Sequence, residues 1–410
     1  MRVFTIALLF LLTAVSANAQ RLCGTADYIK TSFTPDPVLE YGVKPLPARD
    51  TTADEIIVVP VVVHVLFNNS NQQISDAQVL SQLEVLNKDF RLLNTDRTLV
   101  PAAFKKFAAD AKIVFCLAKV DPEGRPTSGI VKKYTGTEFF TGDDAMKFTK
   151  QGGSDAWDSK RYLNIWVCEL FGRSLGYATP PGGPVEKDGV VLKHDVFGTV
   201  GALRPGFNKG RTATHEVAHW LGLKHIWGED ECGDDGVFDT PRQSNYNFGC
   251  PTFPTASTCS PDANGDMYMN FMDLTDDACM QMFTAGQKIR MRSLFAIGGL
   301  RNSILLSYQC DSSLASGAAL PQDSLPGAAK PFIVKVYPNP VVSELHVDAG
   351  EFTTLTGMSA TLYTVAGRPI AKFILRSDKE TLNLLQVPAG VYILKVGTGA
   401  QQHAFKVIKL

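Results

Sequence analysis

Residues 215–225 read His-Glu-Val-Ala-His-Trp-Leu-Gly-Leu-Lys-His. On an α-helix, positions i and i+4 share a face, so His215 and His219 can both direct an imidazole nitrogen at one zinc ion. Glu216 is then beside the metal, where it can take a proton from the attacking water and pass it to the leaving amine. Gly222 can adopt a positive φ and end the helix, so that His225 turns back as a third ligand. Three protein ligands leave one position open for water, which is typical of a catalytic zinc site.

This spacing would rarely arise by chance in a chain of this composition. With 7 His and 34 Gly in 410 residues, the five fixed residues coincide by chance with a probability on the order of 10^-5. The other histidines show no metal spacing, and we expect them to be ordinary strand or surface residues. They are His64, His194, His346 and His403.

Composition excludes several classes of protein. There are 40 Lys+Arg against 41 Asp+Glu, with no long run of like charges, which argues against a nucleic-acid binder or a protein held on membranes by basic patches. A hydrophobic content of 45% argues against disorder. A length of 410 residues predicts two or three globular domains.

The N-terminus has the pattern of an export signal. An apolar run from Phe4 to Val15 is followed by Ala17-Asn18-Ala19, which predicts a signal peptide over residues 1–19. The alternative is a membrane anchor, but the run is shorter than the roughly 20 residues that a bilayer needs. We expect export without a membrane span, into a compartment where cysteines pair.

Residues 20–52 are rich in proline and loop-like, and Arg49 is a candidate cleavage site. We interpret this stretch as a propeptide; the alternative is an N-terminal arm that stays on the domain. Residues 53–310 are expected to form an α+β domain with a twisted mixed sheet and an active-site helix. Its expected strands are 56–67, 112–120, 162–170 and 190–196, and its expected helices are 76–90, 212–223 and 285–295.

The C-terminal part has a different pattern. Residues 311–331 have the composition of a linker. Residues 332–410 contain short apolar runs separated by Pro and Gly, which predicts an all-β sandwich domain. The expected strands are 333–337, 343–347, 360–365, 371–375, 391–396 and 403–409.

The stretch 215–225 resembles the extended zinc motif of the metzincin peptidases, which is followed by a methionine turn. Met269-Asn270-Phe271-Met272-Asp273 offers such a turn, with Met272 as the expected apolar floor under the histidines. The run 270–279, with Trp220-Leu221-Gly222-Leu223, is similar more narrowly to the pappalysin family. That resemblance covers roughly residues 54–305.

Two positions depart from the family pattern. Pappalysins often carry a tyrosine two positions after the turn methionine, credited with steadying the tetrahedral intermediate, whereas this chain has Leu274. Tyr268 is a speculative substitute. In relatives that prefer a basic residue after the cleaved bond, an acidic residue follows the last disulfide cysteine, and here that position is Met280. The departure predicts a weaker preference for a basic residue after the cleaved bond of the substrate.

The resemblance also implies two disulfides, Cys232 with Cys259 and Cys250 with Cys279, each worth about 3 kcal/mol. It implies calcium, for which Asp230, Asp235, Thr240 and the carbonyl of Phe238 offer oxygen ligands. The alternative for that stretch is a solvated acidic loop. A weaker acidic cluster is expected to be a turn; its members are Asp262, Asn264 and Asp266.

Cys23, followed by Gly24, resembles the cysteine of metalloprotease propeptides, whose thiolate fills the open zinc position. This resemblance predicts a zymogen that is released by cleavage near Arg49. The alternative is an ordinary disulfide, with Cys310 as the candidate partner. Cys116 and Cys168 lie in expected strands, and whether they pair or remain buried thiols stays open.

The C-terminal domain resembles the sorting module of type IX secretion. The matching residues are 336–340, 362–363 with 367–368, 388–392 and 406–409. The alternative is a sandwich that binds carbohydrate or protein, which the lack of an aromatic cluster disfavours.

These patterns together predict a monomeric zinc endopeptidase, secreted through the periplasm by the type IX machinery and acting on protein substrates, not on nucleic acid. An extended substrate is expected to add as a strand to a sheet edge, by analogy at 190–192. A catalytically silent scaffold or adhesin is the first alternative, although an intact Glu216 counts against it. A zinc hydrolase of non-peptide amides is the second.

Overall fold

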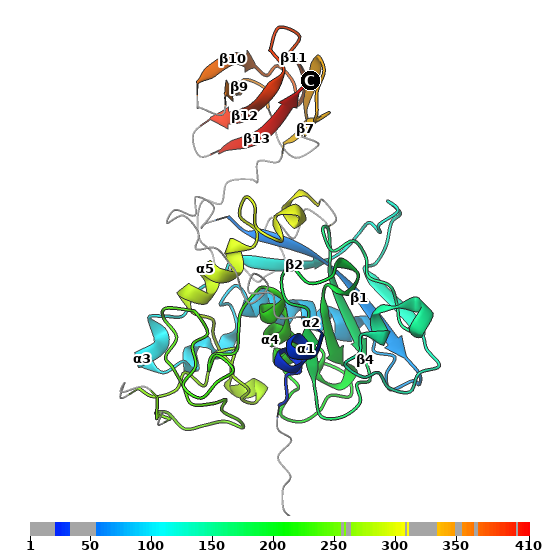
Figure 1. Ribbon diagram of the computed structural model, residues 1–410, viewed down its shortest axis with the longest axis vertical. Helices are drawn as coiled ribbons and strands as arrows, with labels where there is room; N and C mark the ends of the chain where they lie inside the picture. Colours follow the sequence, from blue (N-terminus) through cyan, green and yellow to red (C-terminus); the bar gives the residue numbers. More distant parts are fainter. Residues whose placement is uncertain are drawn as a thin grey trace, which may run out of the picture. The chain divides into compact units, whose positions relative to one another are not determined.

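The structure is a computed structural model. It describes residues 21–32, 55–255, 258–259, 264–307, 310, 334–348, 355–364, 368–398 and 401–410. The chain divides into two compact units, Met1–Asp311 and Ser312–Leu410, which are taken here separately (Figure 1). The expected signal peptide, Arg49, Asp262 and the linker 311–331 lie outside the described residues.

A mixed sheet forms the centre of the first unit, and it confirms the predicted fold class. The strand order is β2-β1-β4-β6-β5, and β3 pairs with the far end of β1. Every pairing is parallel except that of β5 with β6. The strands are β1 Ile57–Phe67, β2 Ile113–Leu117, β3 Ile130–Tyr134, β4 Leu163–Cys168, β5 Gly176–Ala178 and β6 Val190–Lys193. β1 is an almost unbroken apolar run because both of its faces are covered.

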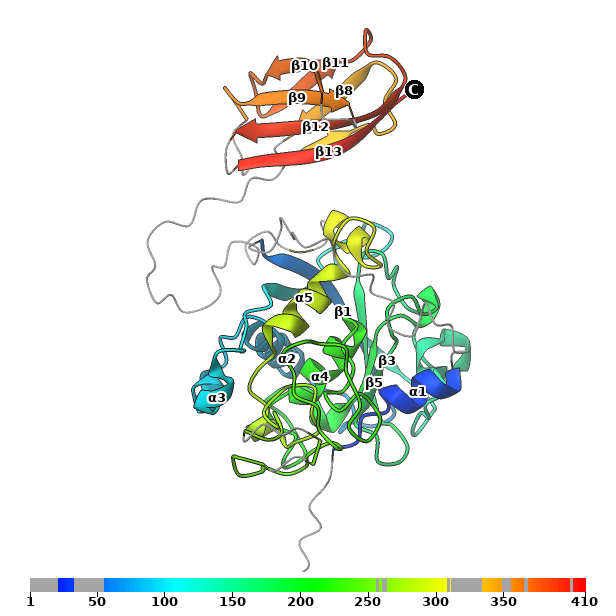
Figure 2. The ribbon, with the colours of Figure 1, turned by 60° about the vertical axis from the view of Figure 1, so that its left-hand side comes forward.

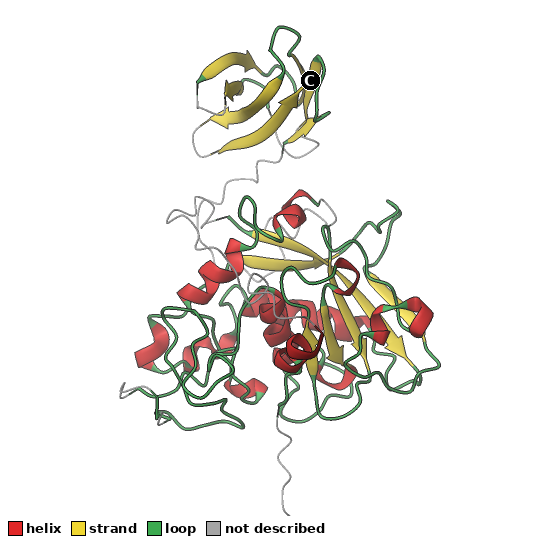
Figure 3. Cartoon of the chain, in the orientation of Figure 1, coloured by secondary structure: helices red, strands yellow, loops and turns green. Residues whose placement is uncertain are grey.

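Helices α2 and α4 pack on each other, and Figure 3 shows them beside the sheet. Helix α2 begins at a cap where Ser75 accepts from Gln78 N, and α5 begins at a reciprocal box between Thr284 and Gln287. The helices are α1 Thr25–Ser32, α2 Asp76–Asp89, α3 Ala102–Lys105, α4 Arg211–Trp220 and α5 Ala285–Ser293. Short 3-10 helices cover Thr95–Leu99, Ala145–Lys147, Thr149–Gln151, Val185–Lys187, His194–Val196, Asp277–Cys279 and Asn302–Leu306.

Three disulfides tie this unit together. Cys232 is bonded to Cys259 and Cys250 to Cys279, both within the loop-rich stretch that follows α4. Cys116 of β2 is bonded to Cys310. Cys23 and Cys168 are free, so the alternative of a Cys23–Cys310 disulfide is wrong.

The second unit consists of two antiparallel sheets around a core of its own, as predicted. One sheet has the order β10-β9-β12-β13 and the other β11-β8-β7. The strands are β7 Lys335–Tyr337, β8 Glu344–Asp348, β9 Ser359–Thr364, β10 Pro369–Ile374, β11 Lys379–Asn383, β12 Gly390–Thr398 and β13 Gln401–Lys409.

One expectation about the first sheet is wrong. Residues 190–192 do not form its edge, because β6 lies between β4 and β5. The edge is β5, a three-residue strand that turns back antiparallel to β6. A strand this short, followed by Pro180 and Pro181, carries no period-2 pattern that a sequence could reveal.

Within the described ranges, no helix has both the length and the apolar character needed to cross a membrane.

Candidate metal centre and active site

Helix α4 carries the central part of the site, and all ten of its residues are buried. The carboxylate of Asp277 marks its start by accepting from the backbone N–H groups of Lys209 and Arg211, at 2.7 and 3.2 Å. A negative charge at a helix N-terminus is favourable because it meets unpaired N–H groups and the positive end of the helix dipole. The start of α4 is therefore held by Asp277, which follows residues 269–273 in the chain.

The end of α4 positions the third histidine. Gly222 adopts φ 83°, its N–H bonds to His219 O at 2.8 Å, and Leu223 N bonds to Ala218 O at 3.0 Å. These two bonds make a Schellman motif, which reverses the chain after a glycine in the left-handed region. The reversal brings His225 back toward the face of α4 that carries His215 and His219.

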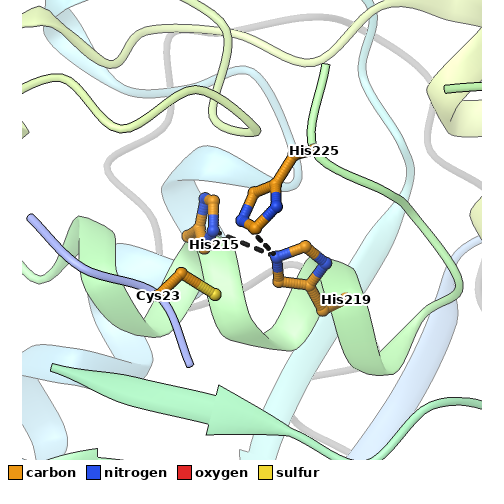
Figure 4. A group of neighbouring side chains, drawn as sticks. All are labelled: Cys23, His215, His219 and His225. Carbon is orange, nitrogen blue, oxygen red and sulfur yellow. Dashed lines mark hydrogen bonds between the residues drawn. The ribbon is translucent and has the colours of Figure 1, made fainter. Parts of the chain in front are cut away.

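The three imidazoles converge (Figure 4). Nε2 of His219 lies 3.1 Å from Nε2 of His215 and 3.1 Å from Nε2 of His225. All three residues are buried. Two nitrogens at this separation can both lie about 2.0–2.1 Å from one zinc ion.

The second ring nitrogens show that this convergence suits a metal. Nδ1 of His215 donates to Phe271 O at 2.7 Å, and Nδ1 of His219 donates to Leu223 O at 2.8 Å. Nδ1 of His225 pairs with the carboxylate of Glu229. Because a carbonyl only accepts, the proton of His215 and of His219 is on Nδ1, and the Nε2 lone pairs face one another. Burial lowers the pKa of His219 to about 3, so protonation does not offset the repulsion between the facing lone pairs. A cation bound among the nitrogens would offset it.

The segment 269–273, the expected methionine turn, contacts the histidine site through Phe271 O. Asp273 N bonds to Asn270 O at 3.1 Å, and Met272 N bonds to the side-chain oxygen of Asn270 at 2.9 Å. The same turn presents the Phe271 carbonyl to His215, and Met272 is fully buried with its carbonyl bonded to Ile226 N.

Glu216 is buried beside the histidines, at 1% exposure. Its Oε2 accepts from the Thr25 hydroxyl at 2.8 Å and from the Cys23 thiol at 3.5 Å. Burial raises the pKa of Glu216 to about 7. The N-terminal segment therefore bonds directly to the carboxylate that is expected to transfer the proton.

Cys23 completes the cluster. One potential ligand atom from Cys23, His215, His219 and His225 each lies within 4.8 Å of the others, and Figure 4 shows the thiol beside the three rings. The segment around Cys23 runs parallel to the edge strand β5, with Leu175 N bonded to Leu22 O and Gly24 N to Gly176 O. The approach at Gly24 is close, since a Cβ there would lie 2.8 Å from Ser174 Oγ and 3.3 Å from Gly176 O.

Two further residues of this segment, Thr25 and Arg21, make contacts that the sequence did not predict. The Thr25 hydroxyl also accepts from Ala178 N at 2.9 Å. The Arg21 side chain is buried, pairs with Asp277, and bonds to Thr212 Oγ1 and Thr275 O, each at 3.1 Å. The only sequence signal for these contacts is their nearness to Cys23, because an isolated Arg or Thr in a loop has no motif.

The expected calcium ligands come together only in part. Asp235 Oδ1 accepts from the Thr240 hydroxyl at 2.8 Å and from Val237 N at 3.0 Å. Asp235 Oδ2 is buried without a hydrogen-bond partner, and burial raises the pKa of this carboxyl to about 6. Asp230 is exposed and Phe238 is 80% exposed. The unpartnered oxygen fits a cation, because ionised carboxylates are favoured calcium ligands.

The positions that depart from the family pattern are packed in the core. Leu274 and Met280 are buried among apolar side chains. Tyr268 is half-buried, and its carbonyl accepts from the Thr275 hydroxyl at 3.1 Å.

Two families of known proteins match the chain. Residues 147–296 match the peptidase family M43, described as pregnancy-associated plasma protein-A. Residues 335–410 match the secretion system C-terminal sorting domain.

Individual relatives agree with these matches. An extracellular metalloprotease of Verticillium alfalfae is 31% identical over 269 residues, which is 61% of this chain and 80% of the relative. Mature mirolysin of Tannerella forsythia, solved with a cleaved peptide, is 47% identical with a TM-score of 0.61, and the match covers 65% of this chain and 99% of that one. A mutant of promirolysin from the same organism is 45% identical with a TM-score of 0.65, over 70% of this chain and 97% of that one.

Proposed function

This chain belongs to the M43 family of pappalysin-like metallopeptidases and is a secreted zinc endopeptidase made as a zymogen, and we propose that Glu216 is its general base and acid. We propose His215, His219 and His225 as the zinc ligands. The observation that carries the assignment is that Nε2 of His219 lies 3.1 Å from Nε2 of both His215 and His225, while all three Nδ1 atoms bond elsewhere.

Zinc, when bound, supplies Lewis acidity that polarises the peptide carbonyl and acidifies water. Glu216 then accepts the proton of the attacking water at its carboxylate and delivers it to the leaving nitrogen. Each ring is held in orientation by the contact of its Nδ1 atom. The partners of His215, His219 and His225 are, in that order, Phe271 O, Leu223 O and Glu229. We propose the fully buried Met272 as the apolar floor of the site.

Because β5 is the edge of the sheet, it is the strand to which a substrate would add, in place of residues 190–192. Release of the segment 22–25 would make three backbone groups along this edge available for pairing, namely Leu175 N beside β5 and Gly176 O and Ala178 N within it. An extended peptide that adds to a sheet edge uses the same backbone groups.

Latency is proposed to come from residues 21–25 acting as one plug. Cys23 supplies the fourth ligand atom at the metal. Thr25 donates a hydrogen bond to Glu216, and Arg21 anchors the segment through its ion pair with Asp277. Cleavage near Arg49 would release it. We propose residues 1–19 as signal peptide, 20–52 as propeptide, 53–310 as catalytic domain, 311–331 as linker and 332–410 as the sorting domain that the secretion family match identifies.

Calcium is proposed at Asp235 and Thr240, with the carbonyl of Phe238 and Asp230 as further ligands. The unpartnered buried oxygen of Asp235 supports it. We also propose that the enzyme is a monomer.

The zinc assignment is tested by zinc content and casein cleavage of the activated protein beside its Glu216→Gln variant. Glutamine keeps the size of the side chain but cannot take the proton. We expect one zinc per chain in both proteins and a loss of cleavage of about 10^2- to 10^4-fold in the variant. Zinc in both with equal cleavage would remove Glu216 from the reaction, and zinc with cleavage in neither would favour a silent scaffold.

The latency proposal is tested with the uncleaved precursor carrying Cys23→Ala. We expect this precursor to cleave casein, whereas Cys168→Ala, which removes the other free thiol, should stay latent. A Cys23→Ala precursor no more active than the wild-type precursor would contradict the proposal.

A further inference from the structure

Tyr28, on the first helix, fills a pocket at the far end of the edge strand from Arg21. The residue is 4% exposed. Its ring centroid lies 4.6 Å from that of Tyr177, which belongs to β5, and its hydroxyl donates to Asp144 Oδ2 at 2.8 Å. Figure 2 shows α1 beside β5. The chain that passes the metal centre at Cys23 therefore stays against the same edge strand as far as Tyr28.

The walls of the pocket are a charged pair buried among aromatic rings. Asp144 is 1% exposed and Lys147 is fully buried. Nζ of Lys147 lies 2.8 Å from Asp144 Oδ1, and it lies over the Tyr28 and Tyr177 rings at 5.1 and 5.0 Å. A phenol suits this place because its ring face attracts the ammonium while its O–H meets the carboxylate.

The walls are also held by contacts that do not involve Tyr28. Lys147 also donates to Thr179 Oγ1 at 3.0 Å and to Lys187 O at 2.9 Å. The Tyr177 hydroxyl donates to Asp144 Oδ1 at 3.0 Å, and Lys187 lies 3.1 Å from Asp144 Oδ2. These groups all belong to the proposed catalytic domain, so release of the propeptide removes the phenol and leaves the pocket in place.

The pocket also adjoins the proposed substrate strand. Thr25, at the start of the helix that carries Tyr28, contacts both Ala178 N of β5 and Glu216. One turn of helix therefore separates the group at the general base from the ring in the pocket. A substrate bound along β5 passes the same point.

We propose that the Tyr28 pocket is a substrate subsite of the active enzyme, selective for tyrosine, with Asp144 accepting from the phenol. This inference rests on the proposed function. An aliphatic side chain in the pocket would leave Asp144 Oδ2 without its hydroxyl donor, and phenylalanine would fill the ring volume without replacing that donor. Lys147 and Lys187 disfavour a basic side chain there, and Asp144 disfavours an acidic one.

The first test uses the activated enzyme unchanged and varies a peptide of residues 21–32 as inhibitor. Tyr28→Phe should raise the inhibition constant about tenfold or more, because a hydrogen bond to a charged acceptor is lost. Tyr28→Ala should raise it further. Asp27→Ala on the exposed side of the same helix is the matched control and should have little effect. Equal inhibition by the wild-type peptide and its Tyr28→Phe variant would overturn the proposal.

The second test maps cleavage sites in a proteome-derived peptide library. Tyrosine should be enriched over phenylalanine at one position, on one side of the cleaved bond, and Asp144→Asn should reduce the Tyr-to-Phe ratio there. An active enzyme with the same Tyr-to-Phe ratio at every position would contradict the subsite alone. Failure of the proposed function is a separate result, since it would show as absent zinc or absent casein cleavage in the wild type.

Discussion

At the scale of single residues, the Thr25 hydroxyl joins the propeptide to the catalytic carboxylate. It donates to Glu216 and accepts from Ala178 N, so Thr25→Val keeps the shape but leaves two buried polar groups without this partner. Each unsatisfied group costs about 1–3 kcal/mol. We expect the residual activity of the uncleaved precursor to rise about tenfold or more, measured with a quenched fluorescent peptide. Thr31→Val, at an exposed position of the same helix, should leave it unchanged; an equal rise there would point to general loosening of the helix.

Asp235 carries the prediction for calcium. Its unpartnered oxygen is buried, and a bound cation would remove the cost of that carboxylate. Calcium should raise the melting temperature of the wild type, and a chelator should lower it. Asp235→Asn should abolish the response, while Asp234→Asn, whose side chain is 59% exposed, should keep it. A calcium response that survives Asp235→Asn would place the ion elsewhere.

The residues of the zinc site could be predicted from sequence because they lie close together on one helix and its turn. His215, Glu216 and His219 need only the period of an α-helix. The residues of the N-terminal segment that block the site could not be predicted in the same way. Arg21 meets Asp277 across 256 positions of chain, and no local pattern encodes a contact at that separation.

At the scale of elements, long periodic segments were predictable and short ones were not. The expected helix 76–90 is α2 Asp76–Asp89, and the expected strand 56–67 is β1 Ile57–Phe67. The eight-residue helix α1 and the three-residue strand β5 were missed, because a period cannot be recognised in so few residues. These two elements lie side by side at the edge of the sheet, and without β5 the sequence pattern places the substrate edge at residues 190–192.

The turn at the end of α4 supports a prediction about coupling between fold and metal. Gly222 has φ 83°, and the atoms nearest to an added Cβ are Pro181 Cγ at 3.5 Å and Leu294 Cδ1 at 3.6 Å. The space tolerates a methyl group, so the cost of Gly222→Ala comes from the backbone conformation and is about 1–2 kcal/mol. We expect lower thermal stability together with weaker zinc retention against a chelator. Gly124→Ala, which also has a positive φ but open space around it, should cost stability without affecting zinc.

At the scale of the whole molecule, the disulfide between Cys116 and Cys310 closes the longest loop. It spans 194 positions, against 27 for Cys232–Cys259. In the chain-entropy description the long loop is worth about 5 kcal/mol and the short one about 3–4 kcal/mol. Replacing Cys116 and Cys310 together by serine should therefore lower the unfolding free energy more than replacing Cys232 and Cys259. Denaturant titration of the two double variants compares them, and the reverse order would show that local strain or residual structure outweighs loop length.

The two units separate catalysis from export. Because the second unit has its own core, removal of residues 312–410 should leave casein cleavage by the activated enzyme within about twofold, as no catalytic group is lost. The truncated protein should accumulate in the periplasm instead of the medium, measured by fractionation and immunoblotting. Normal release of the truncated chain would contradict a sorting role for this domain.

The position of Arg21 has a consequence for how long the precursor stays silent. If export ends with a cut after Ala19, Arg21 becomes the second residue of the precursor, and its side chain is the buried anchor of the inhibitory segment. An aminopeptidase that trims two residues would then remove the anchor without touching the distant activation site. The enzyme would then become active either after an endoproteolytic cut or after enough time for its N-terminus to be trimmed.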